Sequence, residues 1–548
     1  MLPVEDLLPY AWLVGIWSVI LFSVLSLYRL VEPDGRWGRA LRTRFLMGVP
    51  WGSLVSLVGV LLVYLLVQDG ITNWHRPLRV PFSSWSYLYP TGWFFAPFSH
   101  ANASHLYGNL TAALVLAPLA EYVWGHYPKK RGTQTFSSWR TNPWIRAFVL
   151  FPLGVLVVGL CTSLFAWGPV IGFSGVVFAF AGFALVRYPL VTIVALVARS
   201  AVRTIHQAIV DPIVVAEAVP TLSRPSWYGI AVQGHALGLF LGVAAGAALL
   251  WYRREERRPD PARLWIGTLL VGMSLSLWAI WWVRGEGTFV LYRGLGVAAV
   301  FVLATLVTVA ITASDRPLWG DLTRRQLATL VLVIPLLTMG LVAVPLNLMA
   351  VSDPTVPEDA VTVEDYRVFY AEDVENRMMS VVNVSFYNET TTLTTSGLIV
   401  VSEQRYVWYQ AATRSELAFH GQTTVHLGGL GWRDAVRAER QGWRVVGNDS
   451  VYQVWLEHDD ERTHAFTSDP STASPILEDT RVTLVPEDGT FYLEASRNES
   501  VERAPVPAEN ESVTVGELTI HRDGDDLLAS VNRTEVKIAE RETPRAVE

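Results

Sequence analysis

Ten long apolar runs constrain this chain more than any other feature of its sequence. An α-helix needs about 20 predominantly apolar residues to cross a bilayer. We predict membrane-spanning helices at residues 9–30, 49–67, 104–124, 145–167, 172–187, 189–210, 227–251, 264–284, 288–313 and 327–350. The run 189–210 is the weakest of the ten because two arginines and a histidine interrupt it. The sequence therefore predicts a polytopic α-helical membrane protein.

Charge divides the chain into two parts. Residues 1–350 hold 26 basic and 14 acidic residues, a net charge of +12, whereas residues 351–548 hold 17 basic and 36 acidic residues, a net charge of −19. The single cysteine, Cys161, lies in an apolar run and excludes an intrachain disulfide framework. We expect a basic membrane part followed by an acidic soluble part, with the lipid bilayer and not nucleic acid as a partner.

The basic loops predict the orientation of the spans. Lys and Arg concentrate in alternate loops, and cytoplasmic loops carry such an excess in membrane proteins. The basic positions are Arg36, Arg39, Arg42 and Arg44, then Lys129, Lys130, Arg131, Arg140 and Arg146, then Arg253, Arg254, Arg257 and Arg258, and finally Arg316, Arg324 and Arg325. Ten crossings then place both the N-terminus and the C-terminus outside the cytoplasm.

The acidic tail is predicted to be β-rich and extracytoplasmic. Its β-branched and aromatic segments are separated by turn signals, which favours a β-sandwich-like domain near residues 360–540. N-glycosylation sequons point to exposed loops, and we expect N-glycans on some of them. The sequons begin at Asn383, Asn388, Asn448, Asn498, Asn510 and Asn532. We find no catalytic constellation in this tail.

A serine and a histidine in two of the predicted spans are the candidates for chemistry. Ionisable residues inside membrane helices are costly and are functional candidates by default. Ser174 lies in the sequence GFSG at the start of the run 172–187, and His235 lies near the start of the run 227–251. Both spans are predicted to run inward from the outer surface, so the two side chains share a depth. A serine–histidine pair requires such a match.

Small residues predict that the two helices pack closely. Gly238, Gly242 and Gly246 recur every four residues on one helix face, and small residues at this spacing let backbones approach. Gly175 and Gly182 offer a matching surface on the serine helix. Phe178, one turn after Ser174, is expected to pack on the His235 ring.

A third helix supplies candidate donors for an oxyanion site. His105 and Asn109 are four residues apart and therefore lie on one helix face near the predicted outer surface. Together with the Ser174 backbone N–H they could stabilise a developing negative charge. Each motif alone also fits simple helix packing, and the soluble-hydrolase elbow Gly-x-Ser-x-Gly is absent because Val176 holds the last position. Only the order, topology and shared depth together indicate function.

The combined pattern resembles the rhomboid intramembrane serine proteases. The matching positions are His100, His105 and Asn109, then Gly172, Ser174 and Gly175, then His235, Gly238 and Gly242. The lead-in GWFFAPFSH and the pair Glu121 and Gly125 also look like the family's pattern, and loop 68–97 looks like its lateral loop. Phe178 differs from the tyrosine that many relatives carry there. The resemblance covers residues 49–251.

The resemblance implies roles for these residues. Ser174 would be the nucleophile and His235 the general base, with His105 and Asn109 at the oxyanion. His100, Gly172, Gly175, Phe178, Gly238 and Gly242 would support them. No cofactor or metal is implied. The expected substrates are transmembrane proteins.

The predicted domain order follows from these patterns. We expect an extra helix and cytoplasmic loop at 1–48, a rhomboid-like six-helix catalytic core at 49–251, three further helices at 252–350 and the β-rich domain at 351–548. Two other functions stay open at this point. One is a proteolytically inactive relative that binds membrane proteins, and the other is a polytopic transporter with histidine proton relays.

Overall fold

The computed structural model of the chain divides into two compact units, each considered by itself here. One unit comprises residues 1–282 and 290–348, and the other comprises 283–289 and 349–548. The domain boundaries proposed at 48, 251 and 350 stay predictions. The described residues are 4–31, 35–127, 133–211, 214, 222–253, 259–285, 288–313, 317–319, 322–348, 356–377, 385–386, 389–390, 393–447, 450–498 and 500–543.

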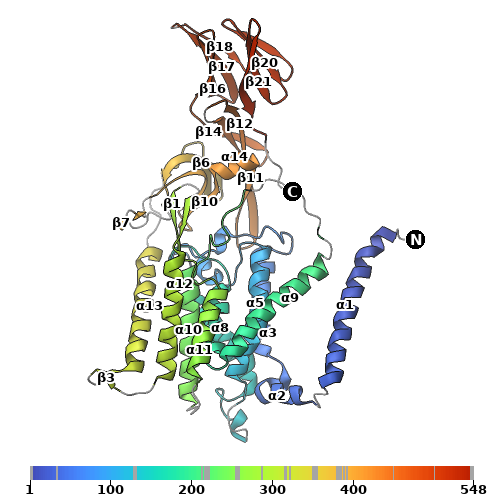
Figure 1. Cartoon of the computed structure of the whole chain (residues 1–548), viewed down its shortest axis with the longest axis vertical. Helices are drawn as coiled ribbons and strands as arrows, with labels where there is room; N and C mark the ends of the chain where they lie inside the picture. The colour runs from blue at the N-terminus through green and yellow to red at the C-terminus, as the bar shows by residue number, and fades with distance from the viewer. Residues whose placement is uncertain are drawn as a thin grey trace. The chain divides into compact units, whose positions relative to one another are not determined.

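The first unit is a bundle of apolar helices (Figure 1). Within the described residues, seven helices are long and apolar enough to cross a membrane, and two further apolar helices are shorter. The helices that match predicted spans are α1 (Val4–Val31), α3 (Trp51–Leu62, continued by a π-turn Val63–Val67), α5 (Ala103–Trp124), α7 (Phe151–Leu164), α8 (Ser174–Leu185), α9 (Pro189–Val210), α10 (Val232–Tyr252), α11 (Pro261–Ser274), α12 (Arg293–Thr312) and α13 (Arg324–Leu348). Short helical segments join them, namely α2 (Arg36–Arg44), α4 (Pro90–Phe95) and α6 (Pro143–Ile145), the last continued into α7 by a π-turn at Arg146–Leu150.

One predicted span is wrong in its second half. Helix α11 ends at Ser274, and Ser276 adopts a left-handed backbone with φ 60°. The residues beyond form a two-stranded sheet, β1 (Trp281–Gly285) and β2 (Thr288–Leu291), so that α12 begins five residues later than the predicted run. These strands are rich in aromatic and β-branched residues, which favour extended structure as strongly as they favour membrane burial.

Helix α8 lies at the centre of the first unit. Ten of its twelve residues are buried, because α5, α7, α9 and α10 surround it. Its side chains Phe178 and Phe180 join a core that includes Tyr64, Leu116 and Leu239. A helix that is apolar on every face belongs in such a position. The N-terminal residue of this buried helix is Ser174.

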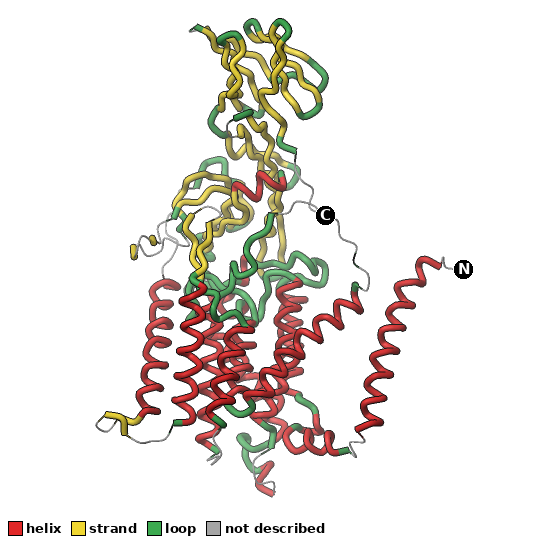
Figure 2. The backbone as a smooth tube through the Cα atoms, in the orientation of Figure 1, coloured by secondary structure: helices red, strands yellow, loops and turns green. Residues whose placement is uncertain are grey.

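The second unit is built mainly from strands, the yellow segments in Figure 2. Its strands pair antiparallel. Its strands are β5 (Val361–Val363), β6 (Tyr366–Glu375), β7 (Ser385–Phe386), β8 (Glu389–Thr390), β9 (Thr394–Ser402), β10 (Val407–Thr413), β11 (Gln422–Gly429), β12 (Trp432–Val445), β13 (Ser450–His458), β14 (Glu461–Thr467), β15 (Ser471–Leu477), β16 (Thr480–Glu487), β17 (Thr490–Arg497), β18 (Ser500–Pro505), β19 (Ser512–Val515), β20 (Leu518–Asp523), β21 (Asp526–Val531) and β22 (Thr534–Arg541). One short helix, α14 (Arg414–His420), interrupts them.

These strands are divided among three larger sheets and do not form a single sandwich. The orders are β10-β9-β6-β5, then β14-β13-β12-β22-β21-β20-β19 with β11 added to β12, then β15-β16-β17-β18. Alternating burial along strands such as β16 is typical of sheets with one face in a core. The β-rich character predicted for the tail is therefore confirmed. Sequons at Asn383, Asn388 and Asn448 lie outside the described residues.

Candidate active site

Ser174 and His235 come together across two neighbouring helices. The serine Oγ lies 2.8 Å from the Nε2 atom of His235, and both side chains are partly buried. Ser174 is the first residue of α8, and His235 lies in the first turn of α10. A hydroxyl that donates to Nε2 requires the ring proton on Nδ1. The pair therefore has the geometry in which an imidazole can accept the serine proton.

Close packing of glycines holds α8 against α10. A side-chain Cβ at Gly238 would lie 2.1 Å from the Gly175 carbonyl oxygen, and one at Gly242 would lie 2.1 Å from that of Ala179. A Cβ at Gly182 on α8 would meet the Leu239 carbonyl oxygen at 2.3 Å. No real Cβ tolerates such distances, so these three positions require glycine. Their absent side chains allow the backbone approach that joins serine to histidine.

An aromatic ring fixes the orientation of the imidazole. Phe178 stacks on His235 with ring centroids 4.3 Å apart and an interplanar angle of 14°. Phe178 follows Ser174 by one helical turn and is almost completely buried. Within the described part of the chain, the Nδ1 atom of His235 has no hydrogen-bond partner, so no carboxylate orients this ring. Packing takes the place that an acidic residue has in a serine triad.

Helix α5 presents His105 and Asn109 to the turn that precedes Ser174. Gly172 in this turn has φ 125°, a conformation that favours glycine. A Cβ at Gly172 would lie 2.9 Å from His105 Nε2 and 3.5 Å from Asn109 Nδ2, so both side chains approach the same small space. The Asn109 Nδ2 atom is buried and has no partner among the residues described. Two donors converge beside the serine without being used by the fold.

His100 supports this arrangement from behind. Its side chain is fully buried, and its ring lies 5.1 Å from that of His105, measured between centroids. Its backbone is held by Gln68, which accepts from the His100 N–H at 2.7 Å and donates to the His100 carbonyl at 2.8 Å. Sequence reasoning missed Gln68, although a glutamine that closes the apolar run 49–67 is a recognisable signal.

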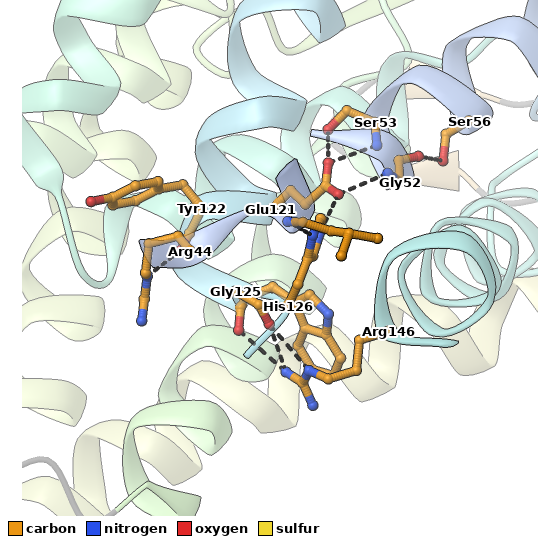
Figure 3. Close-up of polar contacts among 11 residues, drawn as sticks. Arg44, Gly52, Ser53, Ser56, Glu121, Tyr122, Gly125, His126 and Arg146 are labelled. Carbon is orange, nitrogen blue, oxygen red and sulfur yellow. Dashed lines mark hydrogen bonds and ion pairs between the residues drawn. The ribbon is translucent and has the colours of Figure 1, made fainter. Parts of the chain in front are cut away.

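The opposite end of α5 carries a second polar cluster (Figure 3). The Glu121 carboxylate accepts hydrogen bonds from the backbone N–H groups of Gly52 and Ser53, each at 2.7 Å, and from the Ser53 hydroxyl at 2.6 Å. Its Oε1 atom also lies 2.5 Å from His126 Nε2. Because His126 Nδ1 accepts from the Leu46 N–H at 2.8 Å, the ring proton must be on Nε2 and donate to Glu121.

This second cluster is structural. Glu121 is 16 residues from His105 on the same helix, a rise of about 24 Å. Its carboxylate holds the first N–H groups of α3, where the helix dipole favours an anion. Gly125, with φ 63°, ends α5 immediately afterwards. Glu121 thus fastens α3 to α5 far from the serine.

Among its described residues, the second unit offers one group that could approach a metal ion. Asp434, His458 and Asp459 place one ligand atom each within 4.8 Å of one another. His458 Nε2 already lies 3.1 Å from the Asp434 carboxylate, and the Asp459 side chain is 84% exposed. This is the geometry of a histidine–carboxylate contact at the surface of the second unit.

The fold and the pair across α8 and α10 define a multi-pass membrane protein with a serine and a histidine in hydrogen-bond contact. In comparisons with known proteins, the family model for the Rhomboid domain matches residues 88–252. No curated protein and no solved structure gives a significant match. The matched segment contains Ser174, His235, His105 and Asn109. The chain therefore carries a rhomboid domain over residues 88–252.

Proposed function

We propose that the protein is an intramembrane serine endopeptidase that cleaves transmembrane segments of membrane-protein substrates. The observation that carries this proposal is the 2.8 Å contact between Ser174 Oγ and His235 Nε2, made between two helices inside a membrane bundle. An ionisable histidine is costly to bury in an apolar helix bundle, so its presence there suggests a functional role. Nucleophilic catalysis is that role.

The reaction follows from the positions of these groups. His235 Nε2 takes the proton of Ser174 as the Oγ attacks the carbonyl carbon of the scissile peptide bond. The carbonyl oxygen of the scissile peptide bond becomes an oxyanion, which the Asn109 and His105 side chains and the Ser174 N–H stabilise. His235 then donates the proton to the leaving nitrogen, and an ester to Ser174 forms. A water molecule gives a proton to His235 and attacks the ester carbonyl; His235 then returns that proton to Ser174 Oγ as the carboxylic acid product leaves.

Charge at the far end of α5 supports an orientation for the site. Three arginines donate to the last carbonyls of this helix: Arg44 to Val123, Arg146 to Gly125 and Arg253 to Val123. The positive-inside rule would place this end in the cytoplasm and His105 near the outer surface. Cleavage would then occur near the outer end of the substrate helix, and both termini of the chain would be extracytoplasmic.

Exposed sequons support the same orientation. Asn498, Asn510 and Asn532 are exposed at positions with positive φ, which asparagine tolerates in turns. Turns of this kind are accessible to glycosylation on an extracytoplasmic face. We propose N-glycans at these three positions.

The test uses the full chain, reconstituted with a single-span substrate. Wild-type protein should cleave the substrate and react covalently with a fluorophosphonate at Ser174. The Ser174→Ala variant should lose both properties while its unfolding temperature stays close to wild type. Cleavage that persists in this variant would exclude the mechanism. A wild-type protein that binds the substrate but neither cleaves it nor reacts with the fluorophosphonate would instead be an inactive relative.

A further inference from the structure

The loop that leads into Ser174 is held from three directions. It runs from Leu164, the last residue of α7, to Phe173, and α8 begins at the next residue. The path of this loop therefore sets the position of the serine and of Gly172.

Two of the groups that hold the loop come from segments of the helix bundle around the serine. From the loop before α4, Ser84 exchanges hydrogen bonds with Val170, its N–H donating at 3.1 Å and its Oγ accepting at 3.1 Å. From α10, Gln233 donates to the Phe165 carbonyl at 2.7 Å. Gln233 is two residues before His235, so the same helix that supplies the imidazole also holds the loop.

The third direction is α13, a helix outside the segment matched to the rhomboid domain. Asn347, in the last turn of α13, has an exposed fraction of 4%. Its Nδ2 atom donates to the Ala166 carbonyl at 2.9 Å and to the Leu164 carbonyl at 3.3 Å. The Asn347 backbone carbonyl accepts hydrogen bonds from the Tyr87 N–H at 2.9 Å and from the Ser86 Oγ at 3.1 Å.

Asn347 thus joins the two loops that form the surroundings of the nucleophile. An amide group in an apolar helix is costly to bury unless it is hydrogen-bonded. Here both side-chain bonds go to the loop before Ser174, and both backbone bonds go to the loop that Ser84 connects to Val170. The Gly172 N–H, one step further, donates to the Ala96 carbonyl at 2.8 Å.

We propose that Asn347 is a positioning residue for the nucleophile, and that the helices added after the rhomboid domain serve the active site through it. This inference rests on the proposed protease function. Loss of the Asn347 amide leaves the Ala166 carbonyl without its donor and the Leu164 carbonyl with the Tyr87 hydroxyl alone. The loop then gains freedom, and Ser174 moves away from productive geometry. Misplacement of reacting groups lowers the rate of the chemical step more than it lowers binding.

The test compares three variants of the full chain. Asn347→Leu removes the donor at similar volume, and Asn347→Gln restores a donor on a longer side chain. Thr338→Val is the matched control, because Thr338 is on the same helix and its hydroxyl bonds only to Ile334 of that helix. Titration with a fluorophosphonate gives the number of reactive sites, and kcat is then expressed per titrated site.

We expect Asn347→Leu to lower kcat per titrated site roughly tenfold with KM nearly unchanged, and Asn347→Gln to recover most of the loss. Thr338→Val should match wild type. Hydrogen exchange at the amides of Val170 and Gly172 should become faster in Asn347→Leu alone. A normal kcat per site with fewer titratable sites would show a role in folding only and would overturn the proposal.

A second outcome separates this proposal from the protease function. If wild-type protein neither cleaves nor reacts, the protease function fails, and the positioning role fails with it. The exchange measurement still decides whether Asn347 restrains the loop. If wild type is active but exchange in Asn347→Leu is unchanged, Asn347 does not hold the loop and the proposal alone is overturned.

Discussion

The polar clusters at the two ends of α5 differ in the hydrogen bonds of their Glu, His and Asn side chains, although the indole Nε1 atoms of Trp51 and Trp124 at the Glu121 end are also buried without partners among the described residues. At the Glu121 end, the carboxylate and both ring nitrogens of His126 are all hydrogen-bonded. At the His105 end, Asn109 Nδ2, His235 Nδ1 and both ring nitrogens of His100 are buried without partners among the described residues. Native proteins satisfy nearly all such groups, so the exceptions need an explanation.

The difference separates a structural cluster from a reactive one. A complete hydrogen-bond network stabilises one arrangement and has no capacity left for a ligand. Donors that are held in place but unused keep that capacity for a charge that appears only during a reaction. Substitutions at the Glu121 end should therefore lower the free energy of unfolding, whereas substitutions at the His105 end should lower kcat.

The largest effect on stability is expected at the Glu121 end of α5. Glu121→Gln places an amide nitrogen or a weaker acceptor against donors from Gly52, Ser53 and His126. Disrupting one member of a buried charged network typically costs about 3 kcal/mol or more. We expect the free energy of unfolding to fall by about this amount, measured by denaturant titration in detergent. Activity per titrated active site should stay close to wild type.

Ser56→Ala is the matched control for Glu121. Ser56 lies on α3 next to this cluster, and its hydroxyl bonds only to the Gly52 carbonyl of its own helix. We expect little change in unfolding free energy. Equal losses in the two variants would show that the Glu121 network has no special weight.

At the His105 end of α5, a substitution should lower activity and leave stability nearly unchanged. Asn109→Leu removes a donor that the fold leaves unused, so stability should be unchanged or slightly higher. Loss of one oxyanion donor costs roughly 100-fold in kcat in comparable enzymes. We expect that loss in cleavage of a single-span substrate. Thr111→Val, two residues along α5 with its hydroxyl bonded to the Tyr107 carbonyl, should leave kcat unchanged.

A smaller effect is expected at the ring that orients His235. Phe178→Leu removes a stacked aromatic contact of the kind that contributes about 1 kcal/mol. We expect kcat to fall severalfold, and Phe178→Tyr to retain activity because it keeps the ring. Phe180→Leu is the control, since Phe180 is equally buried but packs on Phe151 and Phe173. Similar losses in Phe178→Leu and Phe180→Leu would argue for general packing and against orientation of the imidazole.

The sequence could predict much of this arrangement because membrane helices follow simple rules. Apolar runs and basic loops predict a shared depth for Ser174 and His235, which stays a prediction. Glycine spacing was enough to infer that their helices approach. The structure brings the two side chains within hydrogen-bond distance. The helix boundary at Ser274 was not predictable in this way, since tryptophan and valine are suited both to a membrane span and to a strand.

Contacts between elements far apart in the chain could not be predicted from the sequence. Gln68, Gln233 and Asn347 each hold a backbone segment that is 32 or more residues away. Periodicity shows which face of a helix is polar but not which loop that face will meet. Such residues become interpretable only when the loop before Ser174 and its partners are seen together.

The second unit holds a polar network around Asp365 whose side chains are hydrogen-bonded but partly exposed to water. Burial alone would raise the pKa of Asp365, but hydrogen bonds from Arg405 and Ser402 hold it below its ordinary value. A carboxyl whose pKa is lower in the folded state stabilises the fold above its unfolded pKa, about 3.9. This contribution is lost as pH falls through the folded pKa.

Acid should therefore loosen strands β6 and β9 in wild-type protein more than in Asp365→Asn. We expect amide protection of these strands, corrected for intrinsic exchange rates, to fall as pH decreases from about 5 to below the folded pKa. Asp365→Asn should be less stable at neutral pH and should lose less protection on acidification. Asp488→Asn, at an exposed turn, is the control and should follow wild type. An acid response in Asp365→Asn as steep as that of wild type would mean that other carboxyls govern this unit, and that its polar network is stable without the charge on Asp365.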